Sequence, residues 1–114
     1  MKHLEENLQQ SCVTWFRLQY PHLILIHVPN GGKRNIREAA RFKRLGVTAG
    51  FPDLALFKPS NGYHALFVEM KSEKGTLSAN QKDMIEKLTS LGYKCEVVNS
   101  IELFIKTVEN YLKS

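Results

Sequence analysis

The sequence has few cysteines and no long hydrophobic run. Among its 114 residues only Cys12 and Cys95 are cysteines, and they lack the close spacing of metal ligands, so we expect reduced core residues and no zinc site. No apolar stretch approaches the roughly 18 residues of a membrane span. The first residues also lack the layout of a signal peptide, with charged residues followed by an apolar run. These absences predict a protein that does not enter the membrane and that resides in the cytoplasm.

Repeats, low-complexity segments and linkers are absent as well. A chain of this length can bury one core but has no room for a second, so we expect a single domain over residues 1–114. Its hydrophobic content of 43% and charged content of 24% are those of an ordinary globular protein.

Basic residues are concentrated in one segment. The net charge is only +5, but six of the sixteen lysines and arginines lie between Lys33 and Arg44. A helix expected over residues 34–45 would place four arginines on one face and apolar residues around the other side. Such a row repels itself unless an anion lies against it, and phosphate is the usual anion. A basic face that is merely solvated is the alternative. The four arginines are Arg34, Arg37, Arg41 and Arg44.

Periodicity predicts helices and strands in alternation. Helical spacing of apolar residues covers 4–20, 34–45, 78–91 and 100–112, and short apolar runs at 23–28, 53–57, 65–71 and 93–98 indicate strands. Residues 23–28 look too apolar for an exposed edge, so we expect a strand that is covered on at least one side. Ser78 and Gln81 form a capping box, which is a sufficient structural reason for Gln81. The fold class is therefore α/β, a small mixed sheet of about four strands flanked by helices.

The centre of the chain is a predicted β-hairpin. Residues 53–57 and 65–71 flank a segment rich in turn-forming residues, and a ladder centred on Asn61 pairs residues whose numbers sum to 122. Asp53 then lies opposite Glu69, with the two Cβ atoms about 5 Å apart. Alternation along the strand puts Lys71 on the same face as Glu69.

Two carboxylates this close favour either a shared proton or a cation between them. Mg²⁺ and Mn²⁺ prefer carboxylate and water oxygens, so a divalent metal is the natural partner of Asp53 and Glu69. The pattern Pro52-Asp53 followed by Glu69-Met70-Lys71 resembles the signature of PD-(D/E)xK nucleases. A bare Glu-x-Lys is common in exposed strands, so the neighbouring motifs decide whether this one belongs to a nuclease site.

Three other features remain open from the residues alone. Glu5 falls on the side of its helix that carries Cys12 and Phe16, whereas Glu6 falls on the wet side, although both also suit the first turn of a helix. His27 could approach the acidic pair or be an ordinary strand histidine. The Gly31-Gly32 turn could admit a phosphate or be only a turn.

Several motifs occur together in one order. They run from Val28-Pro29-Asn30-Gly31-Gly32 through the basic helix and Gly50-Phe51-Pro52-Asp53 to Phe67-Val68-Glu69-Met70-Lys71 and Ser78 to Gln81. Over essentially the whole chain this series resembles the VRR-NUC family, the virus-type replication-repair nuclease domain. The resemblance implies a PD-(D/E)xK, restriction-endonuclease-like fold and hydrolysis of DNA phosphodiesters with Mg²⁺ or Mn²⁺.

The resemblance also implies roles for individual residues. Asp53, Glu69 and Glu5, with the Met70 carbonyl, correspond to the metal ligands. Lys71 corresponds to the catalytic lysine and Gln81 to the family glutamine, and Gln9 matches the spacing that follows the acid of the first helix. The DNA-binding candidates are Asn30, Lys33, Arg34, Arg37, Arg41 and Arg44.

The chain resembles the stand-alone bacterial and phage members of the family, which act as homodimers on branched DNA. That implies a homodimeric resolvase of four-way (Holliday) junctions in the cytoplasm of a bacterium or a phage-infected cell. A monomeric flap or nicking endonuclease and a non-catalytic DNA-binding module are the alternatives.

Overall fold

The computed structural model describes residues 4–29 and 36–113. In this part of the chain helices and strands follow the predicted order. Two strands, β2 and β3, are adjacent in sequence and form the expected hairpin, and helices separate the others. The elements are α1 (Leu4–Gln19), β1 (Leu25–His27), α2 (Ile36–Arg44), β2 (Leu54–Leu56), β3 (Leu66–Met70), α3 (Ala79–Ser90), β4 (Lys94–Val98) and α4 (Ile101–Leu112).

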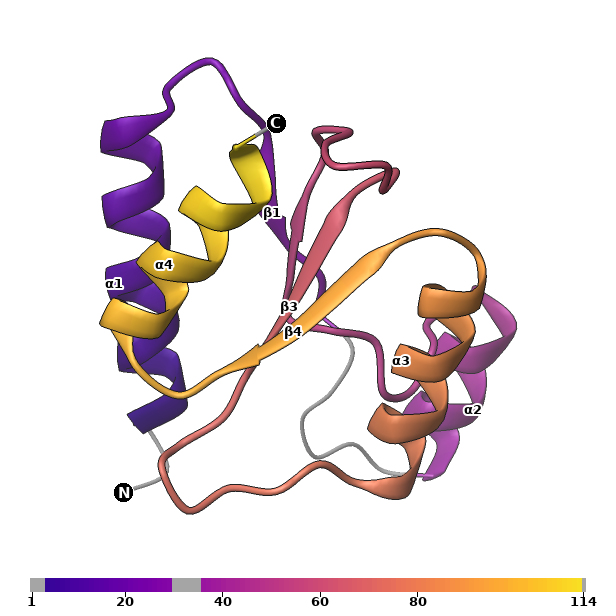
Figure 1. Cartoon of the computed structure of the whole chain (residues 1–114). Helices are drawn as coiled ribbons and strands as arrows, with labels where there is room; N and C mark the ends of the chain where they lie inside the picture. The colour runs from indigo at the N-terminus through magenta and orange to yellow at the C-terminus, as the bar shows by residue number, and fades with distance from the viewer. Residues whose placement is uncertain (1–3, 30–35, 114) are drawn as a thin grey trace.

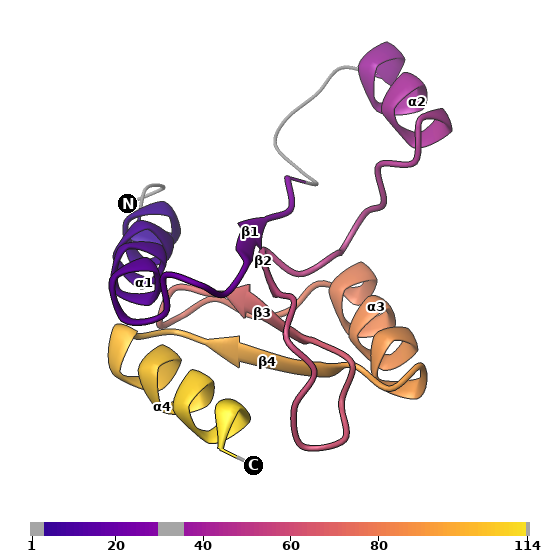
Figure 2. The same ribbon diagram turned by 90° about the horizontal axis from the view of Figure 1, so that it is seen from above.

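The strands form one mixed sheet in the order β1-β2-β3-β4. The first three are antiparallel neighbours, and β4 lies parallel to β3. Parallel neighbours need a long crossover, and here α3 supplies it. Helices α1 and α4 lie on one face of the sheet and α3 lies on the other (Figures 1 and 2). The predicted fold class, a small mixed sheet flanked by helices, is confirmed.

The hairpin has the predicted register. Leu54 pairs with Val68 and Ala55 with Phe67, so the residue numbers sum to 122. At the tip, Asn61 (φ 53°) and Gly62 (φ 85°) both adopt the left-handed conformation that a two-residue hairpin turn requires.

The hairpin contributes to a core on both faces of the sheet. On the side of α1 and α4, alternate residues such as Leu54 and Val68 pack with Phe16 and Phe104. On the side of α3, Phe67 packs with Leu88. Glu69 follows Phe67 by two positions and therefore lies on the α3 face.

Strand β1 lies at the edge of the sheet, where so apolar a segment was not expected, but α1 covers one of its faces, as the expectation of cover on at least one side requires. Leu25 is buried against α1, but Ile24 and Ile26 keep 60% and 40% of their surface exposed. They point to the α3 face, and α3 packs there around Phe67, which lies two strands away. Phe57, which pairs with Ile24 through a 3.0 Å backbone hydrogen bond, is 51% exposed.

Helix α2 has no buried residue. We expected its apolar side chains to make contacts, yet Ile36 is 89% exposed and Leu45, just after the helix, is 71% exposed. Only Phe42 is half-buried. Figure 2 gives the reason, because α2 stands away from the sheet. Within the described ranges, no helix combines the length and apolarity that a membrane crossing needs.

Candidate active site

Asp53 and Glu69 are brought together by the hairpin. Asp53 directly precedes β2, and Glu69 is the fourth residue of β3. The backbone N–H of Met70 donates a 2.7 Å hydrogen bond to Asp53 Oδ2. The Asp53 carboxylate is thereby anchored beside Glu69, as the register predicts.

Glu69 is buried, with only 3% of its surface exposed. Its Oε2 accepts a 3.0 Å hydrogen bond from Gln81 Nε2 and lies 3.8 Å from Lys71 Nζ. Its Oε1 has no hydrogen-bond partner in the described part of the chain. Burial, followed by the negative charge of Asp53, raises the pKa of Glu69 to about 8 against the opposing effect of Lys71.

Gln81 both caps helix α3 and hydrogen-bonds Glu69. Its backbone N–H donates to Ser78 Oγ, and its Oε1 accepts from the Ser78 N–H at 2.8 Å, which is the predicted capping box. The remaining side-chain donor, Nε2, is the group that reaches Glu69. The cap therefore fixes the orientation of an amide that holds the buried carboxylate.

Glu5, from the first turn of α1, also faces this region. It is half-buried, whereas Glu6 is exposed. Glu5 Oε2 accepts a 3.2 Å hydrogen bond from the N–H of Ser72, the residue after Lys71, and its charge contributes to the raised pKa of Glu69. Glu5 does not join Asp53 and Glu69 in one cluster of carboxylates. Over residues 4–29 and 36–113, no three His, Cys, Asp or Glu side chains form a group that could hold a metal ion.

The donors that do converge suit a hard divalent cation. A buried carboxylate oxygen without a partner is costly, and a second carboxylate beside it adds repulsion. A cation bound by Asp53 and Glu69 would satisfy the free oxygen and remove the repulsion. Carboxylate donors favour Mg²⁺ or Mn²⁺ over softer metals.

Two contacts near the site were not specified by the sequence. His27, left open as a residue that could approach the acidic pair, has its Nδ1 2.9 Å from the Asp53 carbonyl oxygen and 3.1 Å from Gln9 Nε2, which ties β1 and α1 to the loop before β2. That open alternative for His27 and the spacing of Gln9 from Glu5 were the signals for this contact. Gly50 (φ 83°) approaches α3 so closely that a Cβ atom there would lie 2.5 Å from the Asn80 carbonyl oxygen. In the sequence, Gly50 stood out only as part of the motif before Pro52-Asp53, and its contact with α3 was not predicted.

Three of the four arginines predicted to bind DNA lie on α2, an element that carries none of the acidic-site residues. Arg37, Arg41 and Arg44 are all exposed on α2. The Arg41 guanidinium stacks 4.9 Å from the centre of the Phe42 ring. The other three DNA-binding candidates, Asn30, Lys33 and Arg34, lie outside the described residues.

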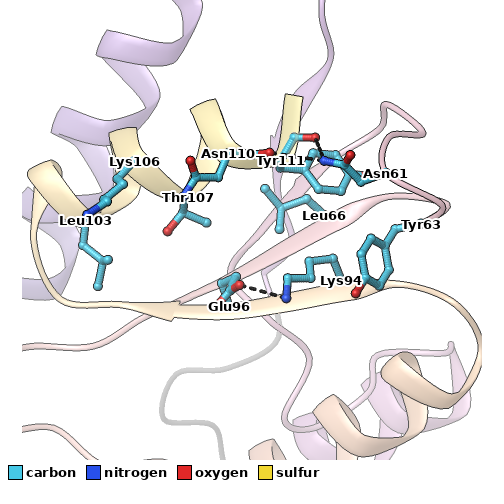
Figure 3. Close-up of a pocket in the computed structure, with 10 residues that line it drawn as sticks. All are labelled: Asn61, Tyr63, Leu66, Lys94, Glu96, Leu103, Lys106, Thr107, Asn110 and Tyr111. Atoms are coloured by element: carbon cyan, nitrogen blue, oxygen red, sulfur yellow. Dashed lines mark hydrogen bonds and ion pairs between the residues drawn. The ribbon is translucent and has the colours of Figure 1, made fainter. Parts of the chain in front are cut away.

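A separate pocket of about 490 Å³ lies between β4, α4 and the tip of the hairpin (Figure 3). It includes Leu66, at the opposite end of β3 from Glu69. Two of its charged groups are paired with each other, since Lys94 Nζ lies 3.1 Å from Glu96 Oε2. Asn61 Nδ2 likewise donates to the Tyr111 carbonyl at 2.9 Å. This pocket is not part of the acidic site.

Comparison with known proteins agrees with this geometry. The VRR-NUC domain family matches residues 3–102. A solved structure described as "VRR_NUC domain protein" has a TM-score of 0.80 and 30% identity, covering 96% of this chain and 88% of the other. A second, described as "VRR_NUC domain", has a TM-score of 0.62 and 21% identity over 95% and 97%, which shows the fold alone. Comparison with curated proteins gives no match. The chain belongs to the VRR-NUC family, nuclease domains of the PD-(D/E)xK type.

Proposed function

We propose that residues 1–114 form one metal-dependent, structure-specific DNA endonuclease domain that resolves four-way junctions as a homodimer. The observation that carries the catalytic part is Glu69, a buried carboxylate with one unpartnered oxygen. Asp53, Lys71 and Gln81 surround it. Without a metal, a proton shared between Glu69 and Asp53 can offset the repulsion of the two carboxylates, and a divalent cation would take the place of that proton.

In this proposal Asp53, Glu69 and the Met70 carbonyl would hold Mg²⁺ or Mn²⁺, and Glu5 would complete the set. Such a metal would supply a bound water of lowered pKa and positive charge near the phosphate. Glu5 is held beside this region because its Oε2 accepts a hydrogen bond from the N–H of Ser72, the residue after Lys71.

The chain's own groups orient the reactants. The Met70 N–H holds Asp53, and Gln81 holds Glu69, so neither carboxylate has to reorganise. Lys71 Nζ lies 3.8 Å from Glu69 Oε2, and from there its ammonium group orients the attacking water and stabilises negative charge on the phosphate. Arg37, Arg41 and Arg44 bind the DNA backbone.

One observation favours pairing of two copies. Ile24, Ile26 and Phe57 expose apolar surface side by side at the edge of the sheet, and none of the three carries a charge that would suit DNA. Contiguous apolar surface of this kind marks protein interaction sites. A second copy related by a twofold axis would match the symmetry of a four-way junction.

The test compares labelled four-way junction, flap, single-stranded and plain duplex DNA with Mg²⁺ or Mn²⁺. Asp53→Asn keeps the size of the side chain and removes its charge. Asp83→Asn is the matched control, because Asp83 forms only an exposed pair with Lys87 at 3.1 Å. We expect paired symmetric cuts in the junction by the wild type and the control, and none by Asp53→Asn.

The other outcomes separate the alternatives. Cleavage of flaps but not junctions, by a monomer, would replace the resolvase with a flap endonuclease. Binding without cleavage of any substrate would leave a DNA-binding module.

A further inference from the structure

A second pocket lies next to the acidic site and is lined by apolar residues. Its volume is about 370 Å³, and it is formed by the end of β1, the residues just after α2 and the loop that leads into β2. Val28, Leu45, Val47, Thr48 and Phe51 contribute to its walls. The volume falls within the usual range of small-molecule sites, about 300 to 1,000 Å³.

The pocket is joined rigidly to both carboxylate-bearing strands. The Val28 N–H donates a 2.9 Å hydrogen bond to the Asp53 carbonyl, and Phe51 is only two residues before Asp53. The Phe51 ring packs edge-on against Phe67 at 5.2 Å between centroids, and Phe67 is two residues before Glu69. Two residues of extended chain span at most about 7 Å. That is the distance of about two base steps along one DNA strand.

The walls specify the chemistry of the occupant. Among the residues that the structure describes, no side chain lining the pocket is charged, and the hydroxyl of Thr48 donates to the Gly46 carbonyl at 3.2 Å. The occupant is therefore a largely apolar, uncharged group. Arg41 and Arg44 are exposed on α2, directly before Leu45 in the wall, so that group is attached to an anionic chain. A nucleobase on its phosphate backbone has both properties, and its flat face can stack on an aromatic ring.

A base within an intact duplex cannot reach such a pocket, because it is stacked and paired. Bases at a branch point, a flap or a nick unstack at much lower cost. Occupation of the pocket would therefore distinguish branched or frayed DNA from plain duplex.

We propose that the pocket between β1 and the loop after α2 binds an unstacked nucleobase beside the phosphodiester that is cut. This assignment rests on the proposed function, because it takes DNA to be the substrate. It adds the element that selects DNA structure, which the carboxylates and arginines by themselves do not supply.

The first experiment scans the DNA and leaves the protein unchanged. A four-way junction is made with a single abasic site at each position near the branch, and affinity is measured by fluorescence anisotropy in Ca²⁺ so that binding is separated from cleavage. We expect affinity to fall about 10-fold at one position, the size of one lost base–aromatic stack, and to stay constant elsewhere. Equal affinity at every abasic position would overturn the proposal.

The second experiment uses two variants that each replace an aromatic ring by leucine. Phe51→Leu removes the ring from the pocket wall, and Tyr63→Leu removes a ring at the tip of the hairpin, outside the acidic site and outside the proposed dimer surface. We expect Phe51→Leu to weaken binding of intact junction about 10-fold but to add little on the sensitive abasic substrate, while Tyr63→Leu changes neither. The same loss on intact and abasic DNA would mean general damage and would refute the assignment.

The two proposals fail separately. If no DNA is cut but the abasic effect is present, the base pocket stands and the nuclease mechanism falls. If DNA is cut and no abasic site alters affinity, the nuclease stands without the base pocket. A change in oligomeric mass in Phe51→Leu with unaltered DNA affinity would assign the pocket to a partner protein's side chain and reject the nucleobase.

Discussion

The buried carboxylate of Glu69 should make the metal-free protein less stable as the pH rises. Its pKa is about 8 in the folded protein against an ordinary value of 4.5, first because it is buried and then because Asp53 is beside it. The folded state therefore binds this proton more tightly than the unfolded chain does. The stabilisation from the proton is complete below pH 4.5 and is lost as the pH rises to about 8.

The size of the effect follows from the same two values. Between pH 4.5 and 8 this group lowers the free energy of unfolding by up to about 1.4 kcal/mol per pH unit. At pH 7 the accumulated cost is about 3 kcal/mol, a large share of the stability of a small domain. Glu69→Gln removes the ionisation and keeps an oxygen that can accept the Gln81 hydrogen bond. It should therefore be more stable than the metal-free wild type at pH 7, by up to about 3 kcal/mol.

The assay is urea unfolding in EDTA at a series of pH values from 5 to 8, followed by the same series with Mn²⁺. In EDTA the unfolding free energy of the wild type should fall relative to that of Glu69→Gln as the pH rises. Added Mn²⁺ should restore the wild type and leave the variant unchanged, because only a bound ligand stabilises the folded state. Glu96→Gln is the control. Glu96 lies on β4, opposite Val68 of β3, and forms an ion pair with Lys94 rather than a contact with the acidic site.

Two results would refute this reasoning. One is a difference between wild type and Glu69→Gln that does not change with pH in EDTA. The other is equal stabilisation of both proteins by Mn²⁺, which would place the metal elsewhere.

Three further predictions follow from the same geometry. Lys71→Ala should abolish metal-dependent cleavage and leave binding of junction DNA within about twofold, because its ammonium acts on the reacting phosphate; cleavage at the wild-type rate would exclude that role. Gly50→Ala should lower both the melting temperature and cleavage, since its Cβ would meet the backbone of α3 beside Gln81; unchanged values would show that the contact is not needed. Ile24→Glu should convert a dimer to a monomer in light scattering, whereas Leu91→Glu, at a residue 65% exposed, should remain dimeric; a monomeric wild type would contradict the dimer.

Several features of the site follow from the sequence because they depend on residues close together along the chain. The turn at Asn61 and strict alternation set the register that puts Asp53 beside Glu69. The capping box at Ser78 depends on a spacing of three residues and was equally visible. Helical periodicity also separated Glu5, which is half-buried, from Glu6, which is exposed.

Predictions about exposure were less successful for β1 and α2. An apolar strand and an amphipathic helix both predict buried apolar side chains. Neither pattern indicates which neighbouring element covers them. In the folded chain, α3 lies over Phe67 and leaves Ile24 exposed, and α2 stands off with Ile36 in solvent. Periodicity identifies a face, and only packing decides whether the face is covered.

The sequence by itself determined the order of elements, the hairpin register and the pairing of Asp53 with Glu69, because local backbone geometry propagates along a strand or helix. The tertiary structure alone decided three relations. It placed Glu5 on the Ser72 N–H, it aimed the Gln81 side chain at Glu69, and it left one buried carboxylate oxygen without a partner. These relations join segments that are distant in the chain or depend on burial, and so they arise only when the helices pack against the sheet.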